Sequence, residues 1–106
     1  MSLRRDYQTE ELFKSILKLR TVEECYQYFD DLCTIKEVRD LGQRLEVARR
    51  LDAGASYQQA GEATGASTAT IGRVKKCLEY GTGGYRMILA RMARQDDEQK
   101  GETACG

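Results

Sequence analysis

The chain has 106 residues, no histidine, no proline and a formal net charge of zero. This length supports one small domain, and the absence of proline leaves helices uninterrupted, so we expect an all-α fold. With no histidine, and with cysteines whose spacing fits no metal or redox motif, the composition argues against a metal site and against an enzyme. We expect reduced thiols at the four cysteines, which are Cys25, Cys33, Cys77 and Cys105. No apolar run reaches the roughly 20 residues of a membrane span and no secretory leader is visible, so we expect a cytoplasmic protein without a membrane partner.

Helix starts are marked by hydroxyl residues that precede acidic or amide residues. Such caps occur at Thr9, Thr21, Thr34 and Ser56, and Ser67 is a further cap. The pattern at the second, third and fourth of these is that of a capping box. Together with a last helix near the C-terminus, these signals predict six helices.

Apolar residues recur at helical spacing along most of the chain. They do so within 12–17, 22–33, 35–51 and 85–92. The third stripe consists of Ile35, Val38, Leu41, Leu45, Ala48 and Leu51, and Gly54 ends that helix. Residues 95–106 are polar and lack this period, so we expect one helical domain over 1–94 and a mobile tail over 95–106.

Charge is unevenly distributed although its total is zero. Acidic residues outnumber basic ones within 6–34, and basic residues outnumber acidic ones within 65–94. A neutral chain can therefore present a basic face to phosphates. The alternative is ordinary solvated charge.

Residues 56–79 have the pattern of a helix-turn-helix. A short helix is followed by a corner at Gly65 and by a second helix, in which Ile71, Val74 and Leu78 are expected to be buried. Small residues that let the two helices approach closely are Ala60, Ala63 and Ala66. The candidate DNA-binding residues are Gln58, Gln59, Ser67, Thr68, Ala69, Gly72, Arg73 and Lys76. The alternative is a plain pair of packed helices with a glycine at the bend.

The side chains on this face indicate how DNA would be read. Thr68, Ala69 and Gly72 are short, so we expect methyl contacts, water and DNA shape to carry much of the specificity. Gln58 and Gln59 are candidates for longer polar contacts. Basic residues at 73, 75 and 76 are candidates for phosphate contacts.

The stretch from Leu32 to Leu78 resembles the Trp repressor family, and in particular its YerC/YecD branch of Trp-repressor-like proteins. The likeness is carried by Leu41-Gly42-Gln43-Arg44, by Gly54 and Ser56-Tyr57-Gln58, and by Gly65-Ala66-Ser67-Thr68-Ala69-Thr70-Ile71-Gly72-Arg73. The resemblance implies a six-helix subunit with a helix-turn-helix, in an intertwined homodimer. Its two reading heads would face successive major grooves about 34 Å apart.

The resemblance also implies an effector site. In the family, two arginines sandwich the indole of the corepressor tryptophan, and they match Arg44 and Arg73, while a pocket threonine matches Thr34. The sequence departs from the family at Asp31, Val74 and Cys77, and the last of these stands where the family has a serine. The carboxylate of Asp31 and the branched side chain of Val74 would disfavour the carboxylate and the indole of tryptophan. We therefore expect another small effector or none. The alternative role for the two arginines is phosphate contact and hydrogen bonding between subunits.

Together these observations predict a transcriptional regulator. We expect a repressor that binds double-stranded DNA as a homodimer on a palindromic operator. The alternative is a protein-interaction module that retains the fold without specific DNA affinity. A steep fall of affinity with rising salt would distinguish the first from the second.

Overall fold

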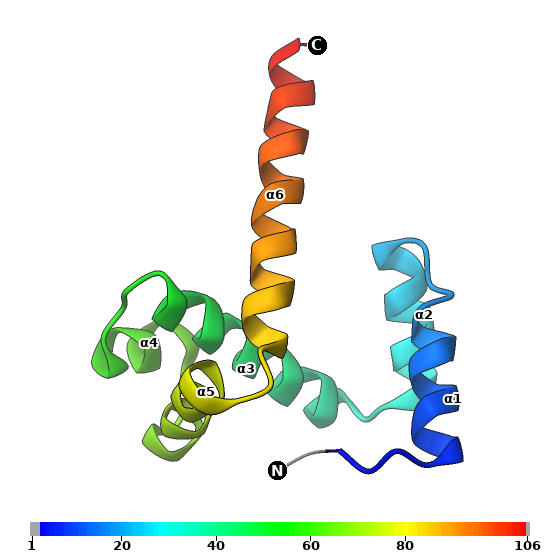
Figure 1. Cartoon of the computed structure of the whole chain (residues 1–106), viewed down its shortest axis with the longest axis horizontal. Coiled ribbons are helices and arrows are strands. Elements are labelled where there is room, and N and C mark those ends of the chain that lie inside the picture. Colours follow the sequence, from blue (N-terminus) through cyan, green and yellow to red (C-terminus); the bar gives the residue numbers. More distant parts are fainter. Residues whose placement is uncertain (1–2, 106) are drawn as a thin grey trace. The chain divides into compact units, whose positions relative to one another are not determined.

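The computed structural model describes the backbone of residues 3–105 and the side chains of residues 3–95. This part of the chain contains six helices and no strand, so the all-α prediction is confirmed (Figure 1). The helices are α1 (Tyr7–Ile16), α2 (Val22–Leu32), α3 (Ile35–Asp52), α4 (Tyr57–Thr64), α5 (Thr68–Tyr80) and α6 (Gly84–Cys105). The chain divides into two compact units, 1–38 and 39–106, and the boundary lies within α3.

Side-chain caps begin several of the helices as expected. Ser56 and Gln59 form a complete capping box at α4, and the hydroxyl of Ser67 accepts a hydrogen bond from the Thr70 amide at the start of α5. At α3 the Thr34 hydroxyl accepts from the Glu37 amide at 3.1 Å, and the Glu37 carboxylate accepts from the Thr34 amide at 2.8 Å. These local signals therefore fix three helix starts.

The first two caps differ in detail from the prediction. Helix α1 is capped by Asp6, whose carboxylate accepts from the Thr9 amide at 2.8 Å, so the prediction of Thr9 as the cap is wrong. Asp6 lies three residues earlier and is an equally good cap, which moves Thr9 into the first turn. Thr21 caps α2, but the Glu24 carboxylate accepts from the amide of Arg20 instead of that of Thr21.

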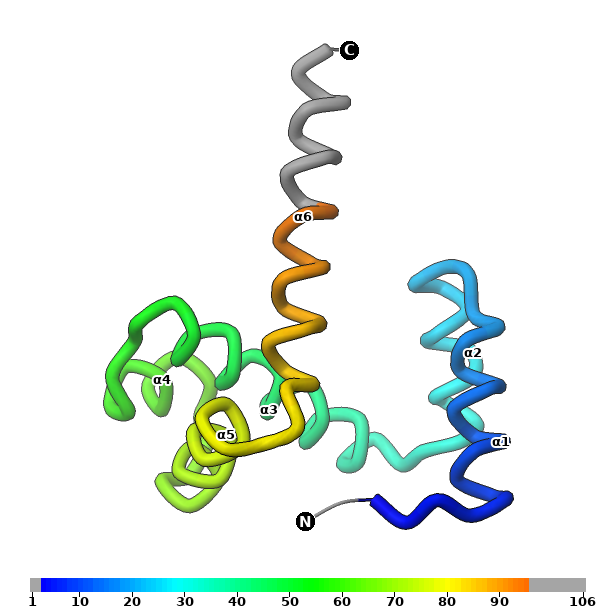
Figure 2. Tube along the Cα trace, viewed as in Figure 1, coloured from blue at the N-terminus to red at the C-terminus, as the bar shows by residue number. Residues whose placement is uncertain are grey.

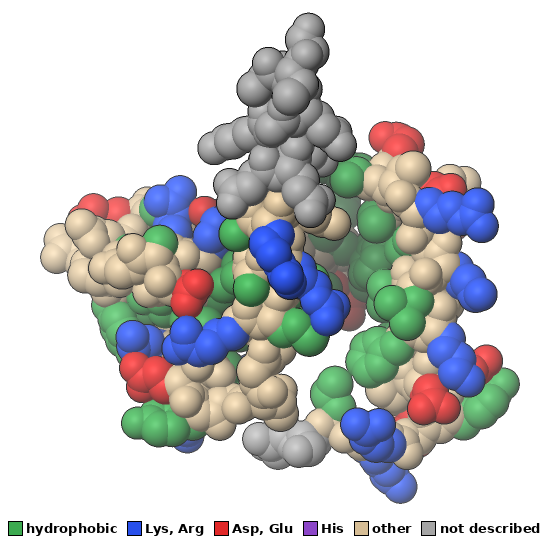
Figure 3. All heavy atoms as spheres, turned by 45° about the horizontal axis from the view of Figure 1, so that its top comes forward, with side chains coloured by type: hydrophobic (Ala, Val, Ile, Leu, Met, Phe, Trp, Pro, Cys, Tyr) green, Lys and Arg blue, Asp and Glu red, His purple; other side chains and the backbone are tan. Residues whose placement is uncertain are grey.

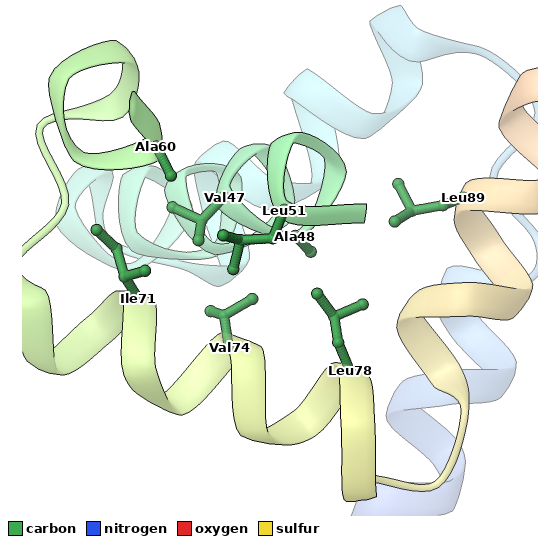
Figure 4. Packing of buried hydrophobic residues seen from close by; sticks show 8 residues of the cluster. All are labelled: Val47, Ala48, Leu51, Ala60, Ile71, Val74, Leu78 and Leu89. Carbon is green, nitrogen blue, oxygen red and sulfur yellow. The ribbon is translucent and has the colours of Figure 1, made fainter. Parts of the chain in front are cut away.

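The buried core belongs to the second unit. It joins α3, α4, α5 and α6, whose apolar side chains point toward one another (Figure 4). Its members are Val47, Ala48, Leu51, Ala60, Ile71, Val74, Leu78 and Leu89. Three of the eight residues come from α5, so the second helix of the predicted motif is held by the core along one side.

Only the second half of α3 follows the expected stripe. Ile35, Val38 and Leu41 are exposed, whereas Val47, which is absent from that stripe, is fully buried. The buried residues of α3 that meet α4, α5 and α6 lie within 47–51, and Leu45 packs against them. The period was therefore read correctly as helical, but burial depends on where the other helices pack.

The first unit has no buried side chain among its described residues, 3–38. Exposed fractions are 82% for Leu17, 73% for Val22 and 71% for Tyr26. A hydrogen bond of 2.6 Å between the hydroxyls of Ser15 and Tyr28 joins α1 to α2. Hydrophobic side chains accordingly lie on the surface over these two helices (Figure 3). The unit thus contains the two predicted apolar stripes without a core of its own.

The backbone of α6 continues to Cys105, past the boundary at residue 94 that the loss of apolar period suggested. Gln, Glu and Lys sustain a helix without an apolar stripe, so period alone does not mark its end. Mobility of the tail over 95–106 stays a prediction, since the side chains from 96 onward lie outside the described residues. Within the described part of the chain, no helix has the length and apolar character needed to cross a membrane.

Candidate nucleic-acid interface

A tight corner joins α4 to α5 (Figure 2). Gly65 has φ 75° and ψ 7°, a left-handed conformation that favours glycine, and its amide donates to the Gly61 carbonyl at 2.8 Å. Only three residues separate the end of α4 from the start of α5. The predicted corner and both helices of the motif are therefore confirmed.

The two helices of the motif pack through small residues on α4 and branched residues on α5. Ile71 is buried, Val74 is 1% exposed, and Ala60 is fully buried opposite them. Ala63 is exposed, so its predicted role in close approach is wrong. Gly61 makes that approach instead, because a Cβ built there would lie 3.4 Å from Cδ1 of Ile71.

One hydrogen bond joins the corner to α3, and two more stabilise it from within. The side-chain amide of Gln43 donates to the Thr64 carbonyl at 3.2 Å, which satisfies a carbonyl at the end of α4. The hydroxyl of Thr64 donates to the Ala60 carbonyl at 2.7 Å and accepts from the Ala66 amide at 3.2 Å. Sequence reasoning missed Gln43 and Thr64 in this role. A hydroxyl residue just before a corner glycine is the signal that points to the second of them.

The outer face of α5 is open and short. Thr68, Ala69, Arg73 and Lys76 are exposed, and a Cβ built on Gly72 would meet no heavy atom within 4 Å. A helix with such small side chains at its start can approach another surface closely. We call α5 the reading helix from here on.

The two glutamines at the start of α4 are engaged within the chain. Oε1 of Gln59 accepts from the Ser56 amide at 2.8 Å as part of the capping box. The amide of Gln58 donates to the Glu62 carboxylate at 3.1 Å. Each of these atoms makes one of the two hydrogen bonds it can make, so the present bonds fix the direction in which a DNA contact could form. Each glutamine keeps its other amide group for an external partner.

Ion pairs divide the basic residues of the second unit into two groups. Arg49 and Arg50 pair with Glu46, Lys75 pairs with Glu79 at 3.2 Å, and Arg86 pairs with Asp52 at 3.1 Å. Arg73 and Lys76 make no ion pair with any side chain within 3–95. The basic character of the reading helix therefore comes from these two residues, with Lys75 partly neutralised.

Comparison with known proteins places this geometry in a family. The family described as Trp repressor protein matches residues 7–93. The chain belongs to the Trp repressor family. It is 53% identical over 94 residues to the uncharacterized protein YerC of Bacillus subtilis (strain 168), with 89% of this chain and 90% of that protein covered.

Two solved structures have the same fold. A crystal structure of a candidate Trp repressor from Staphylococcus aureus superposes with a TM-score of 0.82 at 50% identity, covering 84% of this chain and 89% of that chain. A TrpR-like protein from Eubacterium eligens ATCC 27750 gives 0.77 at 46% identity, covering 79% and 87%. The six-helix Trp-repressor-like fold is thereby confirmed. Membership of this family indicates a DNA-binding regulator and not an enzyme.

Three residues of the expected effector site act electrostatically on one phenol. Tyr85 of α6 is half-buried against the core. Burial raises its pKa and the nearby Cys77 adds to that rise, whereas the positive charges of Arg44 and Arg73 oppose it. These three predicted residues are therefore close enough to Tyr85 to act on it electrostatically. Sequence reasoning assigned Tyr85 only to an apolar stripe and did not connect it with the effector site.

Thr34 and the three positions that depart from the family differ from one another in burial and in hydrogen bonding. Thr34 and Asp31 belong to the first unit, and the Thr34 hydroxyl is engaged in the cap of α3. Val74 has its side chain in the core, so it acts there as a packing residue. Cys77 is a free thiol and is exposed.

Proposed function

We propose that this chain is a sequence-specific transcriptional regulator that represses by binding a palindromic operator as a homodimer. The observation that carries the proposal is the division of α5 into two faces. One face is fixed in the core by Ile71, Val74 and Leu78, while the opposite face keeps Arg73 and Lys76 unpaired. A rigid helix with an open outer face fits the major groove of DNA.

The chemistry of the outer face supports a close approach to base edges. The methyl groups of Thr68 and Ala69 suit contact with the methyl group of thymine, and Gly72 adds no bulk. Arg73 and Lys76 lie further along the helix and would bind phosphates. Gln58 and Gln59 would supply longer contacts from α4, and Ser67 lies at the start of the face as the cap of the reading helix.

The first unit supports the homodimer. Its apolar side chains, among them Leu17, Val22 and Tyr26, are exposed in a single chain. Apolar surface of this kind is stabilised by covering it, and a second copy of the chain supplies a matching surface by symmetry. A dimer would also place two reading helices about 34 Å apart, which suits a palindrome.

We further propose that any effector is a small molecule other than tryptophan. Arg44, Arg73 and Cys77 each act electrostatically on Tyr85, and guanidinium groups bind carboxylates and aromatic rings. The thiol of Cys77 stands where the family has a serine. To test for such an effector, the binding of amino acids to the protein is measured separately from the binding of DNA.

The test is selection of bound fragments from random and genomic duplexes, with and without amino acids and cell extract. We expect a palindromic site bound in the nanomolar range, with affinity that falls steeply as salt rises from 50 to 200 mM. Uniform weak binding to all duplexes would contradict the proposal. That outcome would favour a protein-interaction module. The exposed apolar residues of α1 and α2 are the observation that supports this second candidate.

A further inference from the structure

The side chain of Arg86 in α6 connects the reading helix to α3. Nε of Arg86, in the first turn of α6, donates to the Leu78 carbonyl in the last turn of α5 at 2.9 Å. Nη1 of the same guanidinium donates to Oδ1 of Asp52, the last residue of α3, at 3.1 Å. We call these three residues the clasp.

Both charges of the clasp are unfavourably placed for their own helices. Arg86 lies at the positive end of the α6 dipole, and Asp52 lies at the negative end of the α3 dipole. Neither charge therefore stabilises its helix locally, whereas the contact between them compensates both. The Leu78 carbonyl, near the negative end of α5, gains a charged donor at the same time. The ion pair is therefore best explained by a role in fixing the positions of α3, α5 and α6 relative to one another.

The turn between α5 and α6 makes that positioning tight. A Cβ built on Gly81 would lie 2.4 Å from the carbonyl oxygen of Cys77, so the chain turns directly against the last turn of the reading helix. Leu78, before this turn, and Leu89, after it, both lie in the core. The end of α5 is thus held by apolar contacts and by the fork of Arg86.

We propose that Arg86 is a positioning residue for DNA binding, which sets the angle of the reading helix and makes no phosphate contact itself. The proposal rests on the proposed function. Helix α5 has 13 residues and is therefore about 20 Å long. Thr68 lies about 15 Å along the helix from Leu78, so a rotation of about 5° at Leu78 would displace the first turn by about 1.3 Å, enough to weaken a contact between Thr68 and a base edge.

The experiment compares two clasp variants with a matched control on the selected duplex. Arg86→Met opens the clasp, Asp52→Asn removes the negative charge of its ion pair, and Arg94→Met removes one positive charge from α6 outside it. Equilibrium binding is measured over a salt series, and the thermal midpoint is measured for each variant. We expect both clasp variants to weaken binding roughly tenfold, about 1.4 kcal/mol, with an unchanged salt slope, and the control to stay within about twofold.

Asp52→Asn gives the sharpest result because it removes a negative charge. If Arg86 contacted phosphate, this variant would bind DNA as well as wild type or better, and Arg86→Met would lower the salt slope by about one. Either result would overturn the positioning role. If Arg86→Met does not fold, Asp52→Asn alone decides. A wild-type protein that binds no duplex would instead refute the proposed function, and the clasp with it.

Discussion

The substitution Gly72→Ala separates the stability of the reading helix from its proposed binding to DNA. Gly72 lies inside α5, where a Cβ would meet no heavy atom within 4 Å, so nothing within the chain opposes the extra methyl group. Replacing glycine by alanine inside a helix stabilises it by about 1 kcal/mol. For a domain of this size that corresponds to a rise of about 4–8 °C in the thermal midpoint. We expect this rise in the isolated protein.

The same methyl group would lie on the face proposed to meet DNA. It would keep the reading helix from the base edges, and we expect affinity for the selected duplex to fall at least tenfold, about 1.4 kcal/mol. Gly42→Ala is the matched control, since Gly42 lies inside α3 and is equally open. It should raise the thermal midpoint similarly and leave DNA affinity unchanged, with the oligomeric state checked by light scattering.

The outcomes of this pair are unambiguous. A Gly72→Ala protein that is more stable and binds the duplex as tightly as wild type would show that the outer face of α5 does not meet DNA at this position. A loss of stability in both variants would refute the reasoning from helix propensity.

Three further predictions concern single side chains. Arg73→Ala should weaken DNA binding and lower the slope of log affinity against log salt by about one, measured by fluorescence anisotropy; an unchanged slope would remove Arg73 from the phosphate contacts. Ile71→Asp buries a charge without a partner in the core and should abolish cooperative unfolding by circular dichroism, so a normal melting curve would contradict the burial of Ile71. The pKa of Glu37 is held below its usual value of 4.5, chiefly because the Thr34 amide donates to its carboxylate. Because the folded pKa is the lower one, this contribution to stability is present above the unfolded pKa and is lost as pH falls through the folded pKa. Glu37→Gln should therefore flatten the fall of the thermal midpoint between about pH 5 and pH 3, and an unchanged curve would argue against the cap.

Much of the helix-turn-helix could be predicted because its signals are local. Ser56 with Gln59, the left-handed Gly65 and the cap at Ser67 act within a few residues, and the structure has each of them as expected. The missed residues act over longer separations. Gln43 reaches Thr64 across 21 positions, and no short pattern encodes that contact.

The partners of the charged residues could not be predicted from short sequence patterns either. Arg86 was counted among the basic residues of 65–94 that favour DNA binding, yet it is engaged by Asp52 and by the Leu78 carbonyl. Composition gives the number of cations in a segment, whereas partners come from other helices. A basic residue in the first turn of a helix was the available clue, because the helix dipole disfavours it unless a partner compensates.

The sequence by itself determined the number and order of the helices, the caps of α2 to α5 and the corner, because hydrogen bonds and backbone preferences between neighbouring residues set these features. Only the tertiary structure decided which half of α3 is buried, which cations are left unpaired and which side chain closes the end of α5. Those outcomes depend on contacts between helices distant along the chain. Burial and ion pairing arise from such contacts and not from the period of any single helix.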